Sequence, residues 1–314
     1  MKLHEDKSIF KDAVTITAQQ LNITEAFIEK DYWITLVLSN LTKSEYASQT
    51  VFKGGTSLSK GFSLIDRFSE DVDIAVINEN KKSGNEIKTI IRSIEKEMTK
   101  DLNELKIDGI TSKGSRYRKS VFEYLSIDVK NPGNRLIMEV NSFANPYPFK
   151  RVAIKSFISD FFANSGNEKY IEQYDLKPFA LNVLNKEQTM LEKTVSLIRF
   201  SFDENVTESI SKKIRHFYDL YFLMNDAECI SFMKSGDFRE QFNKILKHDR
   251  DMFDEPAGWK EKSVAESPLI TDFEKIWKEL KDIYKSELST LVYAPIPDER
   301  KVADSFNELI KLIQ

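Results

Sequence analysis

The sequence predicts an α+β protein with two lobes. Helix and strand patterns are mixed through residues 1–150, whereas residues 151–314 carry mainly helix patterns. With 314 residues the chain is long enough for two domains, since domains usually contain roughly 100 to 200 residues. We therefore expect a mixed N-terminal domain at 1–150 and a mainly helical domain at 151–314.

Composition indicates a globular chain with a modest negative charge. Apolar residues make up 41% of the sequence, enough to build buried cores. A net charge of -4 argues against a uniformly basic nucleic-acid-binding surface. The single cysteine, Cys229, cannot form an internal disulfide, and one cysteine with three histidines cannot build a Cys/His zinc cage. Since no segment approaches the roughly 18 apolar residues of a membrane span, we expect a soluble cytoplasmic protein without membrane partners.

Apolar periodicity predicts two helices and two strands before residue 110. Residues 24–41 begin at Thr24, a good N-cap residue, and carry apolar side chains on most turns. Residues 86–105 place isoleucine and leucine at helical intervals opposite a charged face, which is typical of a helix lying on a sheet. Between them, the β-branched segments at 51–53 and 72–77 predict strands.

A hairpin is predicted next, followed by helices. The strand-like segments FEYLSIDVK (122–130) and RLIMEVNSF (135–143) flank Asn131, Pro132, Gly133 and Asn134, which are good turn formers. Strand signals fade after Pro148. The expected helices of the second domain lie at about 187–202, 211–225, 237–252, 271–290 and 298–313.

The stretch FKGGTSLSKGFSLIDRFSEDVD (52–73) carries the strongest chemical signal. Gly54 and Gly55 follow an apolar strand, and Thr56 and Ser57 open a short helix. Bare glycine backbone lets a phosphate approach closely, and a helix N-terminus presents free N–H groups to it. We therefore expect these four residues to bind the phosphates of a nucleotide.

Asp71 and Asp73 in the same stretch are candidate metal ligands. On a strand, residues i and i+2 point to the same face, where two carboxylates repel each other unless a cation lies between them. Mg²⁺ prefers oxygen ligands and can join such a pair to substrate phosphates. On the pair alone, an ordinary surface strand end remains an alternative.

The order of these parts resembles the nucleotidyltransferase superfamily that includes polymerase beta. FKGGTSLSKGF and RFSEDVDIAV resemble the first motif of the AbiEii/AbiGii nucleotidyltransferase toxins, which belong to toxin–antitoxin systems of the abortive-infection type. Further stretches agree with that family in the expected order between about residues 25 and 225. They are IEKDYW (28–33), IMEVNSF with Glu139, TMLEKTVSL with Glu192 and Lys193, and RHFYDLYFL with Asp219.

The resemblance implies a mixed-sheet nucleotidyltransferase domain and a helical domain that completes the active-site cleft. It implies that Asp71, Asp73 and Glu139 hold Mg²⁺, that Lys193 neutralises the triphosphate of an NTP, and that Asp219 orients that lysine or an acceptor hydroxyl. Lys53 and Lys60, also candidate phosphate ligands, become secondary to Lys193. The implied acceptor is tRNA, and the implied biological role is phage defence with a cognate antitoxin encoded alongside.

Residue patterns leave alternatives open at several of these positions. Asp128 and Glu139 would share a face of the predicted hairpin, so either could complete the carboxylate cluster; we prefer Glu139, which lies between apolar neighbours. Lys193 could be a surface lysine on an amphipathic helix. Asp219 could pair with Arg215 one turn earlier, and the role of His216 stays open.

Two basic clusters and two other functions also remain. KGSRYRK (113–119) and the group Lys212, Lys213 and Arg215 combine cations with aromatic residues, as nucleic-acid-binding sites do, although the first cluster also suits a solvated loop. The acceptor could instead be a small molecule or a protein hydroxyl. A non-catalytic binding module of the same fold is a further possibility.

Overall fold

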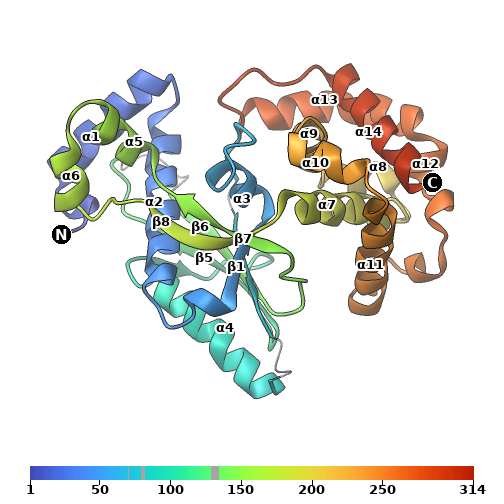
Figure 1. Cartoon of the computed structure of the whole chain (residues 1–314), viewed down its shortest axis with the longest axis horizontal. Coiled ribbons are helices and arrows are strands. Elements are labelled where there is room, and N and C mark those ends of the chain that lie inside the picture. The colour runs from blue at the N-terminus through green and yellow to red at the C-terminus, as the bar shows by residue number, and fades with distance from the viewer. Residues whose placement is uncertain (70, 79–81, 129–133) are drawn as a thin grey trace. The chain divides into compact units, whose positions relative to one another are not determined.

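The computed structural model describes residues 1–69, 71–78, 82–128 and 134–314 (Figure 1). The chain forms two compact units. Unit 1 comprises Met1–Ser63 and Phe68–Leu184, and unit 2 comprises Leu64–Arg67 and Asn185–Gln314. The predicted α+β class is confirmed. The division after Leu184 differs from the expected one at residue 150, which lies inside a strand of unit 1.

A mixed sheet forms the centre of unit 1. Its strands run in the order β3-β5-β6-β2-β1-β8-β7, with β4 paired to β5. β2 is antiparallel to β1 and parallel to β6. The strands are β1 (Thr50–Lys53), β2 (Asp71–Val76), β3 (Asn103–Leu105), β4 (Ser112–Lys113), β5 (Tyr117–Glu123), β6 (Arg135–Asn141), β7 (Phe149–Ile154) and β8 (Phe179–Leu184).

Helices cover one face of this sheet and leave the carboxylates on the other. Val72, Ile74 and Val76 of β2 are buried in one core cluster with apolar side chains of the unit 1 helices. Because side chains alternate along a strand, Asp71 and Asp73 point to the opposite face. The helices are α1 (Lys7–Leu21), α2 (Glu25–Thr42), α3 (Gly54–Lys60), α4 (Gly84–Met98), α5 (Phe157–Asn164) and α6 (Glu168–Gln173), with 3₁₀ turns η1 (Leu3–Glu5) and η2 (Ala47–Gln49).

The predicted hairpin exists, but its first strand is displaced toward the N-terminus. β5 and β6 pair antiparallel, and the residue opposite Glu139 is Lys119. Asp128 lies beyond the end of β5, so the prediction that Asp128 shares a hairpin face with Glu139 is wrong. One physical reason is Glu29, whose carboxylate accepts hydrogen bonds of 2.8 Å from the Ser126 hydroxyl and the Ile127 N–H. The predicted turn at 131–133 lies outside the described residues.

Other boundaries differ because long-range pairing competes with local pattern. The helix predicted at 86–105 ends at Met98, and Asn103–Leu105 pairs with β5 instead. The prediction that strands end near Pro148 is wrong, since β7 and β8 pair with each other and β8 pairs with β1. These short strands are specified mainly by partners distant in the sequence.

Unit 2 is helical. The helix predicted at 211–225 corresponds to α9 (Arg215–Met224), whereas α8 (Val206–Ser211) and α10 (Ala227–Met233) were not predicted. Among the described helices of both units, none is long and apolar enough to cross a membrane. The elements of unit 2 are α7 (Lys186–Phe200), α8 (Val206–Ser211), α9 (Arg215–Met224), α10 (Ala227–Met233), α11 (Asp237–Met252), α12 (Pro268–Thr271), α13 (Phe273–Ser289) and α14 (Glu299–Ile313), with 3₁₀ turns η3 (Trp259–Glu261) and η4 (Val264–Glu266).

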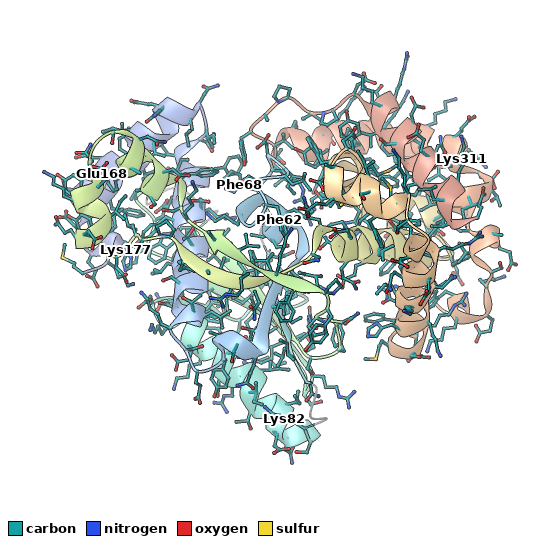
Figure 2. All side chains as sticks on the ribbon, in the orientation of Figure 1. Phe62, Phe68, Lys82, Glu168, Lys177 and Lys311 are labelled. Carbon is teal, nitrogen blue, oxygen red and sulfur yellow. The ribbon has the colours of Figure 1, made fainter. Side chains whose placement is uncertain are left out.

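The segment Leu64–Arg67 joins unit 2 although it lies between α3 and β2 in the sequence. Arg67 forms an isolated antiparallel bridge with Val292, and the Tyr293 N–H donates to the Asp66 carbonyl at 3.0 Å. The chain then returns to unit 1 at Phe68, labelled in Figure 2, whose ring stacks on Phe27 with centroids 4.2 Å apart. Backbone contacts thus hold residues 66 and 67 in unit 2, and an aromatic contact holds Phe68 in unit 1.

Candidate active site

The glycine turn of unit 1 lies directly against a predicted metal ligand. Gly54 has φ +78°, a conformation that favours glycine, and it follows Lys53, the β1 residue paired with Asp73. A Cβ atom on Gly54 would lie 2.1 Å from Oδ2 of Asp73. Backbone angle and side-chain space therefore both require glycine here. The sequence indicated a close approach by phosphate, and the group found close to Gly54 is the Asp73 carboxylate.

Hydroxyl groups tie α3 to the neighbouring backbone. Thr56 Oγ1 donates to the Asp71 carbonyl, and Ser57 Oγ donates to the Gly54 carbonyl at 2.8 Å. Both side chains are buried. These hydroxyl protons are used within unit 1, so α3 can offer a phosphate mainly the backbone N–H groups of its first turn.

The IEKDYW motif contacts the C-terminal end of α3 through Asp31. Asp31 is buried and accepts hydrogen bonds from Lys60 Nζ at 2.6 Å and from the Phe157 N–H at 2.8 Å. Lys60 also donates to the Lys155 carbonyl at 2.6 Å. Lys60 is therefore bound by Asp31 and the Lys155 carbonyl at the end of α3 opposite the glycines. This contact gives the IEKDYW motif a physical role that sequence patterns alone did not indicate.

The three predicted carboxylates share one face of the sheet with the ammonium group of Lys119. Asp73 and Glu139 are register partners on β2 and β6, and Lys119 is opposite Glu139 on β5. Lys119 Nζ lies 2.5 Å from Oε1 of Glu139. Partial burial lowers the pKa of Lys119, but Glu139, Asp71 and Asp73 together raise it above its ordinary value. All three predicted carboxylates thus act on Lys119, which was not predicted as a member of this cluster.

Tyr117 is a second unpredicted member of this cluster. Burial, followed by the charge of Glu139 and a hydrogen bond with it, raises the pKa of the Tyr117 hydroxyl. The ring also lies against Phe143, with centroids 5.9 Å apart. Tyr117 and Lys119 alternate along KGSRYRK, a signal that would have found both residues had this segment been predicted as a strand rather than a loop.

The donor set on this face suits a divalent cation bound together with a nucleotide. Within the described ranges, no three His, Cys, Asp or Glu side chains converge closely enough to hold a metal ion by themselves. Mg²⁺, however, commonly takes one or two protein carboxylates and completes its shell with water and phosphate oxygens. Asp71 and Asp73 supply such a pair on one face.

A separate charged network is buried in unit 2, around Asp219. Arg67 binds this carboxylate with both arms, Nε to Oδ1 at 2.7 Å and a terminal nitrogen to Oδ2 at 2.6 Å. Lys193 Nζ lies 2.7 Å from Oδ2. Burial alone would raise the pKa of Asp219, but Arg67 and Lys193 hold it well below its ordinary value. Asp219 therefore pairs with Lys193 and Arg67, whereas the sequence alternative had paired it with Arg215.

Comparison with known proteins assigns the chain to a family. A family model described as "Nucleotidyl transferase AbiEii toxin, Type IV TA system" matches residues 36–310. The chain belongs to the AbiEii family of nucleotidyltransferase toxins. The predicted enzyme class is thereby confirmed. Among solved structures, MenT4, a nucleotidyltransferase toxin from Mycobacterium tuberculosis H37Rv, is similar at 15% identity, covering 94% of this chain and 98% of that chain with a TM-score of 0.45. No curated protein matches the sequence.

In this AbiEii-family chain the candidate residues form two groups. Gly54, Asp71, Asp73 and Glu139 lie together in unit 1, with Lys119 and Tyr117 beside them. Lys193 and Asp219 are in direct contact in unit 2. Sequence patterns missed Arg67 although it lies inside the first family motif, because a partner 152 residues away cannot be read from spacing.

Replacing Gly54 with alanine should destabilise this AbiEii-family protein. The Cβ atom would displace the Asp73 carboxylate, and we expect a loss of about 1–3 kcal/mol in the free energy of unfolding, measured by urea denaturation. Gly84→Ala is the matched control, because nothing lies within 4 Å of its Cβ position. Equal effects of the two substitutions would contradict the assigned contact.

Asp219→Asn should destabilise unit 2 strongly. The change removes the carboxylate that balances two buried cations, and breaking such a pair costs about 3–5 kcal/mol. Lys193→Met in the same background should restore part of the loss, as chemical denaturation would report. The control is Glu240→Gln, which breaks an exposed pair with Lys244 and should leave the free energy of unfolding nearly unchanged, because water screens exposed pairs. A loss no larger than that of the control would count against the network.

His216 should make stability depend on pH. Burial, followed by the charges of Lys193 and Lys213, holds its pKa well below the ordinary 6.5, so the folded protein keeps His216 neutral. Below pH 6.5 the unfolded chain binds a proton that the folded chain does not, and stability therefore falls as pH decreases, by up to about 1.4 kcal/mol per pH unit. His216→Gln should lose less stability than the parent between pH 7 and pH 5 in urea titrations. Parallel profiles would refute this.

Proposed function

We propose that this toxin is a Mg²⁺-dependent enzyme that transfers a nucleoside monophosphate from an NTP to the acceptor end of tRNA. The observation that carries the proposal is the carboxylate cluster of Asp71, Asp73 and Glu139 beside the Gly54 turn. Family membership supplies the reaction class. The acceptor hydroxyl attacks the α-phosphorus, the bond to the β-phosphate oxygen breaks, and pyrophosphate leaves.

Each residue of unit 1 has a distinct proposed task. Asp71 and Asp73 would hold Mg²⁺, which would align the attack and shield the developing charge on phosphate. Glu139 would assist in holding the cation and in activating the acceptor hydroxyl. Gly54 and Gly55 would present backbone N–H groups to the triphosphate, together with the first turn of α3 that Thr56 and Ser57 stabilise.

In unit 2 the proposed phosphate ligand is Lys193. A compact ammonium group suits the neutralisation of triphosphate charge. Asp219 and Arg67 would act through Lys193 by fixing its position, since Asp219 bonds to both. His216, neutral beside Lys193, would avoid adding a further positive charge to this network.

The proposed biological setting is the cytoplasm of a cell under phage attack. Modification of tRNA acceptor ends would block translation, and an antitoxin encoded alongside would relieve the block. Expression of the toxin alone should therefore arrest growth, and the neighbouring antitoxin gene should restore it.

Labelled-nucleotide transfer tests the chemistry. Purified protein is incubated with each α-labelled NTP, Mg²⁺ and total tRNA, and labelled products are separated from NTP. Asp71→Asn, Asp73→Asn and Glu139→Gln should each lower the transfer rate at least a hundredfold, because the charge that develops in the transition state loses its largest electrostatic partner. Chelation of Mg²⁺ should abolish transfer in the parent protein.

Asp128→Asn is the matched control for these substitutions, because Asp128 is an exposed carboxylate of the same unit, beyond the end of β5. It should retain the parent rate. Equal loss in Asp128→Asn, or undiminished transfer by the Asp71 and Asp73 variants, would refute the assigned site. Label appearing on protein or on a small molecule instead of tRNA would replace the proposed acceptor while leaving the site assignment intact.

A further inference from the structure

Lys119 brings a positive charge into the carboxylate cluster of unit 1. Its ammonium group lies 2.5 Å from Glu139, and the side chains of Lys119 and Glu139 are 27% and 19% exposed. This ion pair is less exposed than the Lys113–Glu104 pair on the adjoining strands, where the values are 34% and 36%, and the difference lies mainly in the carboxylate. Because it is partly buried, the Lys119–Glu139 interaction is screened less by salt and water than a fully exposed pair.

The location of Lys119 matters because three like charges share the face. Asp71, Asp73 and Glu139 would repel one another without a cation, and all three act on the Lys119 ammonium. Lys119 reduces this repulsion in the absence of nucleotide. A divalent cation bound to Asp71 and Asp73 would remove the same repulsion and would in turn repel Lys119.

We propose that Lys119 is a positioning residue that serves as the built-in counter-cation of this cluster and competes with Mg²⁺ for Glu139. The proposal rests on the proposed metal site and adds a regulator to it. With Lys119 on Glu139, the carboxylate is held in place while the cluster keeps too little negative charge to bind Mg²⁺ tightly by itself. Productive binding then needs the phosphates of the nucleotide as additional ligands, which couples metal binding to substrate binding.

The test follows stability during Mg²⁺ titration and needs no activity. Thermal unfolding of the full-length protein is recorded over a MgCl₂ series at constant ionic strength, since a ligand that binds the folded state raises Tm by mass action. Lys119→Met should have a lower Tm than the parent in EDTA. It should also reach its half-maximal Tm rise at a Mg²⁺ concentration on the order of tenfold lower, because a repelling charge has been removed.

Two further variants sharpen this comparison. Lys119→Arg keeps the positive charge and should titrate like the parent. Lys113→Met removes a lysine from the neighbouring pair with Glu104, away from the cluster, and should leave the Mg²⁺ response unchanged. Adding an NTP analogue should narrow the difference between Lys119→Met and the parent, because the phosphates then contribute ligands in both.

The outcomes separate this proposal from the proposed function. If Mg²⁺ stabilises the parent and Lys119→Met over the same concentration range, Lys119 is not a competing counter-cation. A Lys119→Met protein that is unfolded at every Mg²⁺ concentration would make the residue purely structural and would overturn the proposal as well. If Mg²⁺, with and without the NTP analogue, fails to stabilise the parent, or stabilises Asp73→Asn equally, the metal site of the proposed function fails first.

Discussion

The buried carboxylate of Asp219 is the constraint on which the charged core of unit 2 depends, because it holds both Arg67 and Lys193. It is fully buried, and burial of an unpaired carboxylate would be prohibitively costly, so its two cations are required for the fold. Arg67 meets it with a planar two-point contact, the geometry in which guanidinium binds carboxylate best. Lys193 takes the second bond to Oδ2. One side chain thereby fixes the proposed phosphate ligand and retains the segment 64–67 in the helical unit.

In unit 1 the apolar and the charged side chains of the central strands lie on opposite faces of the sheet. The helical face of β2 and β6 is wholly apolar and holds the strands in register. The same alternation places Asp71, Asp73 and Glu139 on the other face, where water, Lys119 and Tyr117 can stabilise their charge. The apolar core therefore supplies the rigidity, while the polar face carries the chemistry.

Sequence could predict the parts of the site that depend on local order. Asp71 and Asp73 share a face because of strand alternation, and Gly54 needs a conformation that its position after β1 suggests. Alternation along 113–119 could have placed Lys119 on one face of a strand, but its pairing with Glu139 depends on the register between β5 and β6, which local pattern does not give. Arg67 depends on a contact across 152 residues. Local pattern also extended one helix through 103–105, where pairing with β5 decides the structure.

The passage of residues 64–67 through unit 2 also constrains how this protein can be made and recombined. The chain crosses between the units after residues 63, 67 and 184, so residues 185–314 are a contiguous stretch of sequence but an incomplete structural unit. During synthesis Arg67 emerges 152 residues ahead of Asp219 and stays without that partner until α9 has been made. If residues 185–314 were replaced by the helical segment of a relative, that segment would need a carboxylate placed to bind Arg67. Evolution of the helical half is therefore tied to one arginine encoded within the first motif.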